Sequence, residues 1–214
     1  METCMKANLV ENSAFSILNF TLLAALCATT AGCFDEPTPA YKTVPAEARV
    51  YLKEKSLGDL KGNLDVLKAD IVDYLNLDRN LLTNVDEVAS LSGLKWLRLN
   101  DNRLSSLPDM KALVALRRVY LKNNRFAAVP EQLKDLPALT DVDLSGNPIK
   151  EIPVWLAEKK GLKNLSFSRT KVGKLPENID AWKSLQSLQL GDLNLSPEEM
   201  ARIRKTLPDV AIVF

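Results

Sequence analysis

Two carboxylates separated by one residue, Asp141 and Asp143, come nearest to a catalytic arrangement in this sequence. On one strand they would lie ~6.6–7 Å apart and point the same way, a spacing at which paired carboxylates cleave glycosidic bonds. Three observations oppose catalysis: Arg118 is expected beside the pair, an open sheet offers no closed pocket, and the chain contains no histidine. We therefore predict that the protein is not an enzyme.

A second group combines aromatic and cationic side chains, the types that are enriched where proteins bind one another. Its members are Tyr74, Trp96, Arg98, Arg118, Tyr120 and Lys122. Together with the two aspartates, they are the predicted ligand-binding residues. The alternative is that these rings and cations stabilise their own sheet through cross-strand and cation–π contacts.

Composition limits the remaining classes of function. The chain has 214 residues, of which 46% are hydrophobic and 26% are charged, as in an ordinary globular domain. Its net charge of +1 gives no general attraction to nucleic acid. The sequence contains no glycine-rich phosphate loop, no metal-ligand spacing and no nucleic-acid motif. We therefore predict no cofactor, no metal and no nucleic-acid partner.

The elements that must position these side chains come from an internal repeat. Residues 94–104 read L-x-x-L-x-L-x-x-N-x-L, so apolar residues alternate as on a short strand and an asparagine follows where the chain turns. The first apolar residue recurs in steps of 22, 22, 23, 23 and 23, at Val72, Leu94, Leu116, Leu139, Leu162 and Leu185. The asparagine recurs as Asn80, Asn102, Asn124 and Asn147, and the last two repeats carry Thr170 and Leu193 instead.

These residues resemble the leucine-rich-repeat family over about residues 72–214, with the period of its shorter classes. The resemblance implies a right-handed α/β solenoid with a parallel sheet of about six to seven short strands on its concave face. Stacking physics agrees, because one unit has too few apolar residues for a closed core and needs cover from the next. The asparagine amides are expected to satisfy buried backbone groups, Thr170 would do so in part, and Leu193 would not.

If the leucines point inward, the residues between them point out of the sheet in two rows. Each strand then presents one pair: Tyr74/Asn76, Trp96/Arg98, Arg118/Tyr120, Asp141/Asp143, Asn164/Ser166 and Ser187/Gln189. The first three strands are aromatic and basic, the fourth is acidic, and the last two are small and polar. We expect Tyr74 and Trp96 to stack, with Arg98, Arg118 and Lys122 within reach.

A helical cap is predicted on the N-terminal side of the repeats, over residues 41–71. Extending the repeat backward by 22 residues places lysines at leucine positions, so the register fails. Pro45 at a first helical position predicts a helix over residues 46–56. Leucine and isoleucine at helical spacing then predict a second, shorter element. Six repeats follow, over residues 72–195.

A second cap is predicted over residues 196–214. Ser196 is suited to cap a helix that begins at Pro197, with two acids in its first turn. Residues 210–214 then fall in register with the leucines of the last repeat and predict a truncated final strand.

The start of the chain resembles a bacterial lipoprotein signal. Residues 14–32 are almost free of charge, Lys6 precedes them, and small residues stand before Cys33. The resemblance implies removal of residues 1–32, lipidation of Cys33, a tether over residues 33–40, and attachment to a membrane of the bacterial cell envelope. The alternatives are an ordinary cleaved signal, which would give a secreted protein, and an uncleaved membrane anchor.

The function predicted from these features is that of a non-enzymatic binding module at the cell envelope. It would contact a protein partner through its concave strands. The first alternative is a glycan or cell-wall binding surface on which Tyr74, Trp96 and Tyr120 stack. The second is a mainly structural envelope lipoprotein without a dedicated ligand.

Overall fold

A computed structural model describes residues 49–61, 64 and 71–214 of the chain. These residues belong to one compact unit, Val44–Phe214. The predicted signal, the lipid-attachment residue Cys33 and the tether lie outside the described residues. Within the described part, no helix has both the length and the apolar character needed to cross a membrane.

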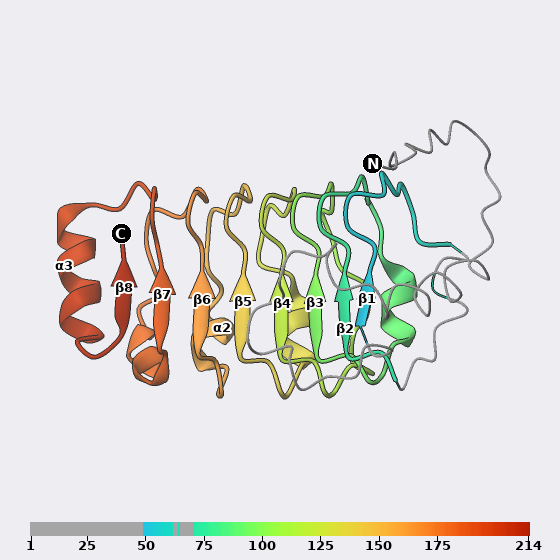
Figure 1. Cartoon of the computed structure of the whole chain (residues 1–214). Coiled ribbons are helices and arrows are strands. Elements are labelled where there is room, and N and C mark those ends of the chain that lie inside the picture. The colour runs from blue at the N-terminus through green and yellow to red at the C-terminus, as the bar shows by residue number, and fades with distance from the viewer. Residues whose placement is uncertain (1–48, 62–63, 65–70) are drawn as a thin grey trace, which may run out of the picture. The chain divides into compact units, whose positions relative to one another are not determined.

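Eight short parallel strands form one sheet in the described residues and follow one another in chain order (Figure 1). They are β1 (Arg49–Tyr51), β2 (Tyr74–Asn76), β3 (Trp96–Arg98), β4 (Arg118–Tyr120), β5 (Asp141–Asp143), β6 (Asn164–Ser166), β7 (Ser187–Gln189) and β8 (Ala211–Val213). Neighbouring strands pair at equal positions of the repeat, so that Leu75, Leu97 and Val119 lie side by side. The unclosed parallel sheet on one side of a coil confirms the predicted leucine-rich-repeat solenoid.

The opposite side of the coil consists of extended segments and single helical turns. The turns are η3 (Asp86–Ser90), η4 (Glu131–Asp135), α2 (Val154–Glu158) and η5 (Ile179–Ser184). Between the two sides runs one continuous apolar core, in which Leu97 and Leu99 have 0% exposure. Burying one leucine contributes ~1.5–3 kcal/mol, and here each leucine is covered by the turns on either side.

A ladder of asparagines closes the turns that follow the strands, as predicted. Asn102 Nδ2 donates to the carbonyl oxygens of Leu77 in the preceding turn and of Leu99 in its own, at 2.9 and 3.1 Å. Its Oδ1 accepts the amide of Leu82 at 3.1 Å. Asn80, Asn124 and Asn147 make the corresponding bonds.

Thr170 does not take over the role of the asparagine, so the prediction of a partial substitute is wrong. Its hydroxyl is buried and has no hydrogen-bond partner in the described part of the chain. The threonine side chain is one bond shorter than that of asparagine and does not reach the carbonyl groups at this turn. The ladder therefore ends at Asn147.

The N-terminal cap begins as a strand, so the predicted helix over residues 46–56 is wrong where the structure describes it. Val50 pairs with Leu75, and Leu52 N donates to Asn76 O at 2.7 Å. Val50 and Leu52 thus stand 25 residues before Leu75 and Leu77, a longer step than the 22 residues assumed from the repeat. Strand β1 also brings the number of strands in the described residues to eight, above the six to seven predicted.

A longer turn absorbs the additional residues. Glu54 and Ser56 both have positive φ angles, 58° and 54°, which lets the chain fold back within a few residues. Most of the second predicted N-terminal element lies outside the described residues.

The helix and the final strand predicted for the C-terminal cap are both present. Helix α3 (Pro197–Thr206) begins at the predicted proline, and Ser196 Oγ accepts the amide of Glu199 at 3.2 Å. The chain then returns to the sheet as β8, whose Ile212 pairs with Leu188 of β7. Helix α3 lies at the end of the coil, beyond the last turn (Figure 1).

Candidate binding face

The outer face of the sheet carries the two predicted rows of side chains, and we call it the concave face. Strand pairing places Arg49, Tyr74, Trp96, Arg118, Asp141, Asn164, Ser187 and Ala211 in the first row. The second row consists of Tyr51, Asn76, Arg98, Tyr120, Asp143, Ser166, Gln189 and Val213. The predicted pairs therefore share one face in the predicted order.

Four aromatic rings make a continuous chain across β1 to β4. The rings of Tyr51 and Tyr74 are 5.2 Å apart, those of Tyr74 and Trp96 are 5.6 Å apart and nearly perpendicular, and those of Trp96 and Tyr120 are 5.7 Å apart. These centroid distances are typical of favourable aromatic pairs. Tyr74 and Trp96 are in contact as predicted, but the rings meet edge to face and do not stack.

The two arginines of the cluster lie against these rings. The Arg118 guanidinium is 4.3 Å from the centre of the Trp96 ring, and that of Arg98 is 5.9 Å from the centre of the Tyr120 ring. Arg98 Nη2 also lies 2.6 Å from Asp78 Oδ2. Lys122 follows β4 and is partly exposed. The two arginines and the aromatic rings therefore hold one another in position.

Tyr74 and Asn76 differ from the expectation that both residues of each pair are exposed. Tyr74 is 3% exposed and Asn76 is 6% exposed. Tyr74 is packed between two neighbouring rings, and Asn76 Oδ1 accepts the amide of Asp78 at 2.9 Å. In this structure, the accessible part of the aromatic cluster is thus centred on Trp96 and Tyr120, which are half-buried.

The Asp141 carboxylate is fully engaged by its neighbours. Its Oδ1 accepts Asn164 Nδ2 at 2.6 Å, and its Oδ2 accepts the Thr140 hydroxyl at 2.5 Å. Arg118 Nε lies 3.7 Å from the same Oδ2. The charge pairing with Arg118 that the sequence indicated is therefore present.

Asp143 is bound through one oxygen and borders a hollow in the sheet. Its Oδ1 accepts the Ser145 amide at 2.9 Å and the Ser145 hydroxyl at 2.5 Å. The hollow has a volume of about 290 Å³ and is lined by Tyr120, Asp141, Val142, Asp143, Asn164, Leu165, Ser166, Ser187 and Gln189. Its polar groups can donate and accept hydrogen bonds, but it is shallow and open.

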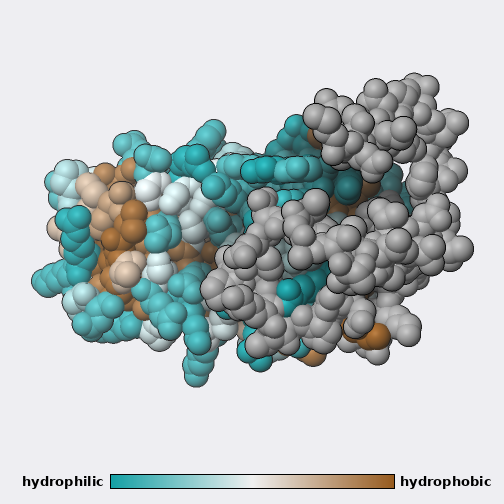
Figure 2. All heavy atoms as spheres, in the orientation of Figure 1, coloured by the Kyte–Doolittle hydropathy of each residue, from teal (hydrophilic) through white to brown (hydrophobic). Residues whose placement is uncertain are grey.

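The C-terminal part of the face is less polar. Figure 2 shows pale and hydrophobic residues gathered toward β8, where Val213 is 49% exposed. The concave face therefore changes along the solenoid from aromatic and cationic, through acidic, to small and apolar side chains.

Two contributions to this face were not predicted from the sequence. Tyr51 extends the aromatic chain by one strand, but its position depended on the irregular spacing of β1. Asp78 and Asn100 form a second ladder at the strand ends, in which each Oδ1 accepts an amide of the next turn. In the sequence, the signal for this second ladder is the polar residue that directly follows the last leucine of each strand, Asp78 after Leu77 and Asn100 after Leu99.

The arrangement is suited to noncovalent recognition by stacking, hydrogen bonding and charge pairing. In the described residues, no group of three or more histidine, cysteine, aspartate or glutamate side chains could hold a metal ion. Asp141 and Asp143 lie before and after Val142 on the same face of the sheet, but their carboxylates are engaged in separate hydrogen-bond networks.

Comparison with known proteins supports the fold. The model of the leucine-rich-repeat family matches residues 92–149. A search of the curated proteins found no match. The structure is similar to that of an internalin from Listeria monocytogenes, with 18% identity and a TM-score of 0.62, over 78% of this chain and 56% of the internalin.

Two further solved structures match. A TDR receptor is 22% identical, with a TM-score of 0.62, over 81% of this chain and 30% of the receptor. A leucine-rich-repeat protein of Leptospira interrogans is 26% identical over 67% of this chain and 56% of that protein, with a TM-score of 0.40. The chain thus spans little more than half of the internalin and less than a third of the receptor.

Proposed function

We propose that this leucine-rich-repeat protein is a non-enzymatic binding module that contacts a protein partner through its concave face. Leucine-rich-repeat proteins typically serve as binding scaffolds without enzymatic activity. The proposal also includes its location: a lipid on Cys33 holds the chain at a bacterial cell envelope after the signal is removed.

The observation that carries the proposal is the stacked cluster of Trp96, Arg118 and Tyr120. Tryptophan, tyrosine and arginine are the residues that most often dominate binding energy at protein interfaces. Here they are held by one another on a rigid sheet, so little side-chain freedom is lost when a partner binds.

A protein partner is favoured over a glycan by the position of Arg118. Its guanidinium lies over one face of the Trp96 ring, where a sugar would otherwise stack. A guanidinium in that place can instead pair with a carboxylate of a partner protein. The glycan alternative depends on the remaining ring surfaces.

Cross-linking in the native envelope, followed by retrieval of the protein, tests the partner site. We expect Trp96→Ala and Arg118→Glu each to remove the specifically cross-linked protein. The matched controls are Arg117→Glu, which changes the neighbouring exposed arginine, and Trp155→Ala on the opposite side of the coil. Retention of every cross-linked protein by both concave-face variants would show that the site is wrong.

Salt dependence separates the two kinds of ligand. Association with a protein steered by Arg98, Arg118 and Lys122 should slow as salt rises, because exposed charges are screened. Stacking of a sugar on tyrosine and tryptophan should change little. A ligand that is retrieved as polysaccharide, and whose binding is independent of salt, would establish the glycan alternative.

The anchor is tested separately by mass spectrometry of the mature N-terminus. We expect a chain that begins at Cys33 and carries acyl chains, whose buried methylenes contribute ~0.8 kcal/mol each to membrane attachment. Cys33→Ala should abolish that species. An unmodified mature chain in the medium would instead establish secretion.

A further inference from the structure

The two edges of the solenoid differ in charge. We define the cationic rim as the four segments that follow β3, β4, β5 and β6, residues 99–107, 121–129, 144–152 and 167–175. They contain seven cations, Arg103, Lys122, Arg125, Lys150, Arg169, Lys171 and Lys174, and two carboxylates, Asp101 and Glu151, which gives a net charge of +5.

The opposite edge and the back of the same turns are almost neutral. Residues 109–117, 131–140, 154–163 and 177–186 carry seven cations and six carboxylates, a net charge of +1. Several of these charges are paired, as Lys111 is with Asp109 at 3.5 Å. The two sides of these four turns therefore carry equal numbers of cations, but the rim has fewer carboxylates and so most of their net positive charge.

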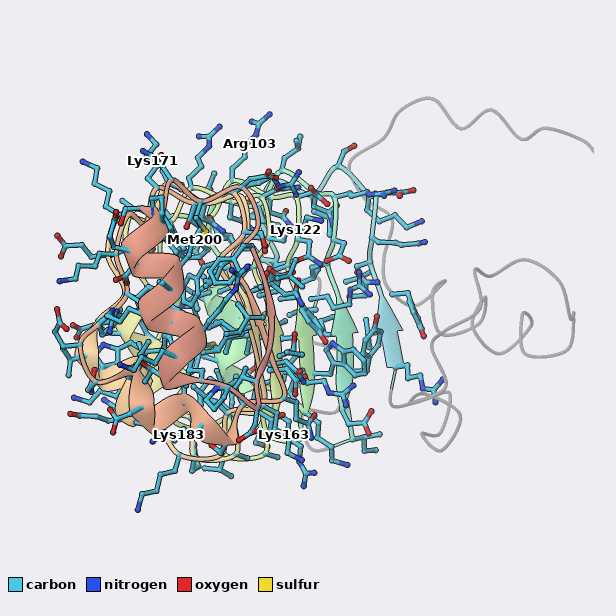
Figure 3. The ribbon with its side chains drawn as sticks, turned by 90° about the vertical axis from the view of Figure 1, so that its left-hand side faces the viewer. Arg103, Lys122, Lys163, Lys171, Lys183 and Met200 are labelled. Carbon is cyan, nitrogen blue, oxygen red and sulfur yellow. The ribbon has the colours of Figure 1, made fainter. Side chains whose placement is uncertain are left out.

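Backbone hydrogen bonds show that three cations of the rim occupy equivalent positions in their turns. Arg103 N donates to Leu82 O and Arg125 N to Leu104 O, at 2.9 and 2.7 Å, and Lys171 occupies the equivalent position three turns after Arg103. Figure 3 shows Arg103 and Lys171 extending from one edge of the solenoid, while Lys163 and Lys183 extend from the other. The rim thus carries an exposed cation on each of its four turns, Arg103, Arg125, Lys150 and Lys171, although the position equivalent to Arg103 in the third turn is Pro148.

Most of these cations lack a carboxylate partner among the residues that the structure describes. Arg103, Arg125, Lys150 and Lys171 are exposed, and none of the ion pairs in the described residues includes them. Exposed cations in a row repel one another, so an anionic surface that lies against them gains from every one.

We propose that the cationic rim docks on the phosphate headgroups of an anionic lipid bilayer. The inference rests on the envelope location given under the proposed function, because a lipid on Cys33 would bring the rim close to such a surface. Cations on one edge of four successive turns can all face one surface, and a basic patch that supplements one lipid anchor is an effective second membrane signal. The C-terminal ends of the strands would then point toward the membrane. The concave face would be directed parallel to the membrane surface, where a partner can reach it.

Nucleic acid fits the rim less well. Its aromatic residues, Phe126 and Phe167, are buried in the core and offer no platform for bases. Headgroup phosphates require only the charge that the rim displays.

Lysine labelling of the full chain tests the proposal. The protein is purified from the membranes of an expressing bacterium and reconstituted with neutral phosphatidylcholine vesicles or with vesicles that also contain phosphatidylglycerol. A water-soluble amine reagent then labels the lysines, and mass spectrometry compares Lys122 and Lys174 on the rim with Lys111 and Lys134 on the other side. We expect anionic vesicles to lower labelling on the rim only, and high salt to restore it.

Two matched variants remove equal charge from the two sides. The rim variant carries R103Q, R125Q, K150Q and K171Q, and the control variant carries R117Q, K160Q, K163Q and K183Q. Because each cation near a charged membrane changes affinity about fivefold, the rim variant should lose the protection and the control variant should keep it.

Three results would overturn the inference: equal labelling on the two vesicle types, equal loss of protection in both variants, or protection of the same lysines by soluble inositol hexakisphosphate in detergent without vesicles. Flotation with neutral vesicles reports the lipid anchor by itself. Failure of the anchor and failure of the rim are therefore distinguishable in one experiment.

Discussion

At the scale of single residues, one asparagine side chain links a turn to its neighbour and stabilises both. Asn102 makes bonds to carbonyl groups of two turns and to one amide, so it joins neighbours that its own backbone cannot reach. Such buried groups cost about 1–3 kcal/mol each when unsatisfied. At Thr170 this link is missing, since the buried hydroxyl makes no bond within the described residues.

We predict that Thr170→Asn stabilises the protein. The amide would donate to Phe167 O and Leu144 O and would accept the buried amide of Ile149, by analogy with Asn147 and Phe126. The expected gain in the free energy of unfolding is about 1 kcal/mol. Urea denaturation measures it, with the exposed Thr83→Asn as the control. An equal or lower stability of Thr170→Asn would contradict the ladder model.

At the scale of the elements, helix α3 is fastened to the preceding turn by a buried ion pair. Glu199 Oε1 accepts the amide of Leu175 at 2.9 Å and Arg202 Nη2 at 2.8 Å, and the same Nη2 also donates to Leu175 O. The pKa of Glu199 is lowered, chiefly by the hydrogen bond from Arg202. Burial acts in the opposite direction and raises the pKa, while the hydrogen bond from the Leu175 amide lowers it further. The cap thus depends on an ionised carboxylate.

This pKa direction predicts a contribution that is sensitive to acid. A carboxyl group whose folded-state pKa is depressed stabilises the fold fully above its unfolded pKa, about 4.3, and the stabilisation is lost as the pH falls through the folded-state pKa. Glu199→Gln should lower stability by about 1.5–3 kcal/mol at neutral pH, with the difference from the natural protein shrinking in acid. Thermal unfolding between neutral and acidic pH measures this, with the exposed Glu158→Gln as the control. A difference that stays constant with pH would contradict the assignment.

The turns that lead from each strand to the back of the coil share a second requirement. The residue directly before the ladder asparagine, or before the residue that replaces it, has a positive φ angle. This requirement is met by Arg79, Asp101, Asn123, Gly146, Arg169 and Asp192, with φ between 54° and 69°. Only one of the six is a glycine, and a Cβ atom there would lie 2.2 Å from Asn123 Oδ1. Left-handed conformations are unfavourable for residues with a Cβ atom, so five of the six turns retain local strain.

Gly146→Ala should therefore destabilise the protein by about 1–2 kcal/mol, from the left-handed conformation, with a further cost for displacing the Asn123 side chain. Asn123→Ala removes the crowding, so the same change in that background should cost only the conformational part. Urea denaturation of the four proteins gives the coupling. Strictly additive effects would show that the contact with Asn123 carries no penalty.

At the scale of the whole molecule, stability is a sum over neighbouring turns. Most contacts join one turn to the next, and the leucine core runs without interruption from Leu60 to Val210. In the described part of the chain, the turns at the two ends therefore have only one neighbouring turn each, and caps are needed to cover their exposed sides. Strand β8 supplies it at one end, where Ile212 lies beside Leu188.

A chain that ends at Pro208 lacks β8 and should lose stability cooperatively or become insoluble. Removal of this strand exposes the edge of β7 and the adjacent leucines, and it also removes Phe214, on which Arg204 stacks at 4.7 Å. Thermal unfolding and sedimentation compare it with the full chain, and Ile212→Ala serves as a milder control. If the shortened chain melts like the full protein, β8 is not a cap.

The sequence by itself determined the sheet register, the core leucines, the asparagine ladder and the C-terminal cap. Each of these follows from counting positions, because a solenoid places residues one period apart next to each other. The same counting identified the concave-face residues, since residues between inward leucines must point outward. It failed at Val50 and Leu52, where a longer turn moved the register by three residues.

Tertiary structure alone decided how these side chains are used. The repeat fixes where a Cβ atom lies, but burial and pairing depend on the neighbouring turns, which differ in sequence. Tyr74 is buried because rings flank it on both sides, and Asp141 is engaged by Asn164 and Thr140 while one oxygen of Asp143 is not bonded within the described residues. The net positive charge of one rim likewise emerges only when the turns are stacked, because the chain as a whole is nearly neutral.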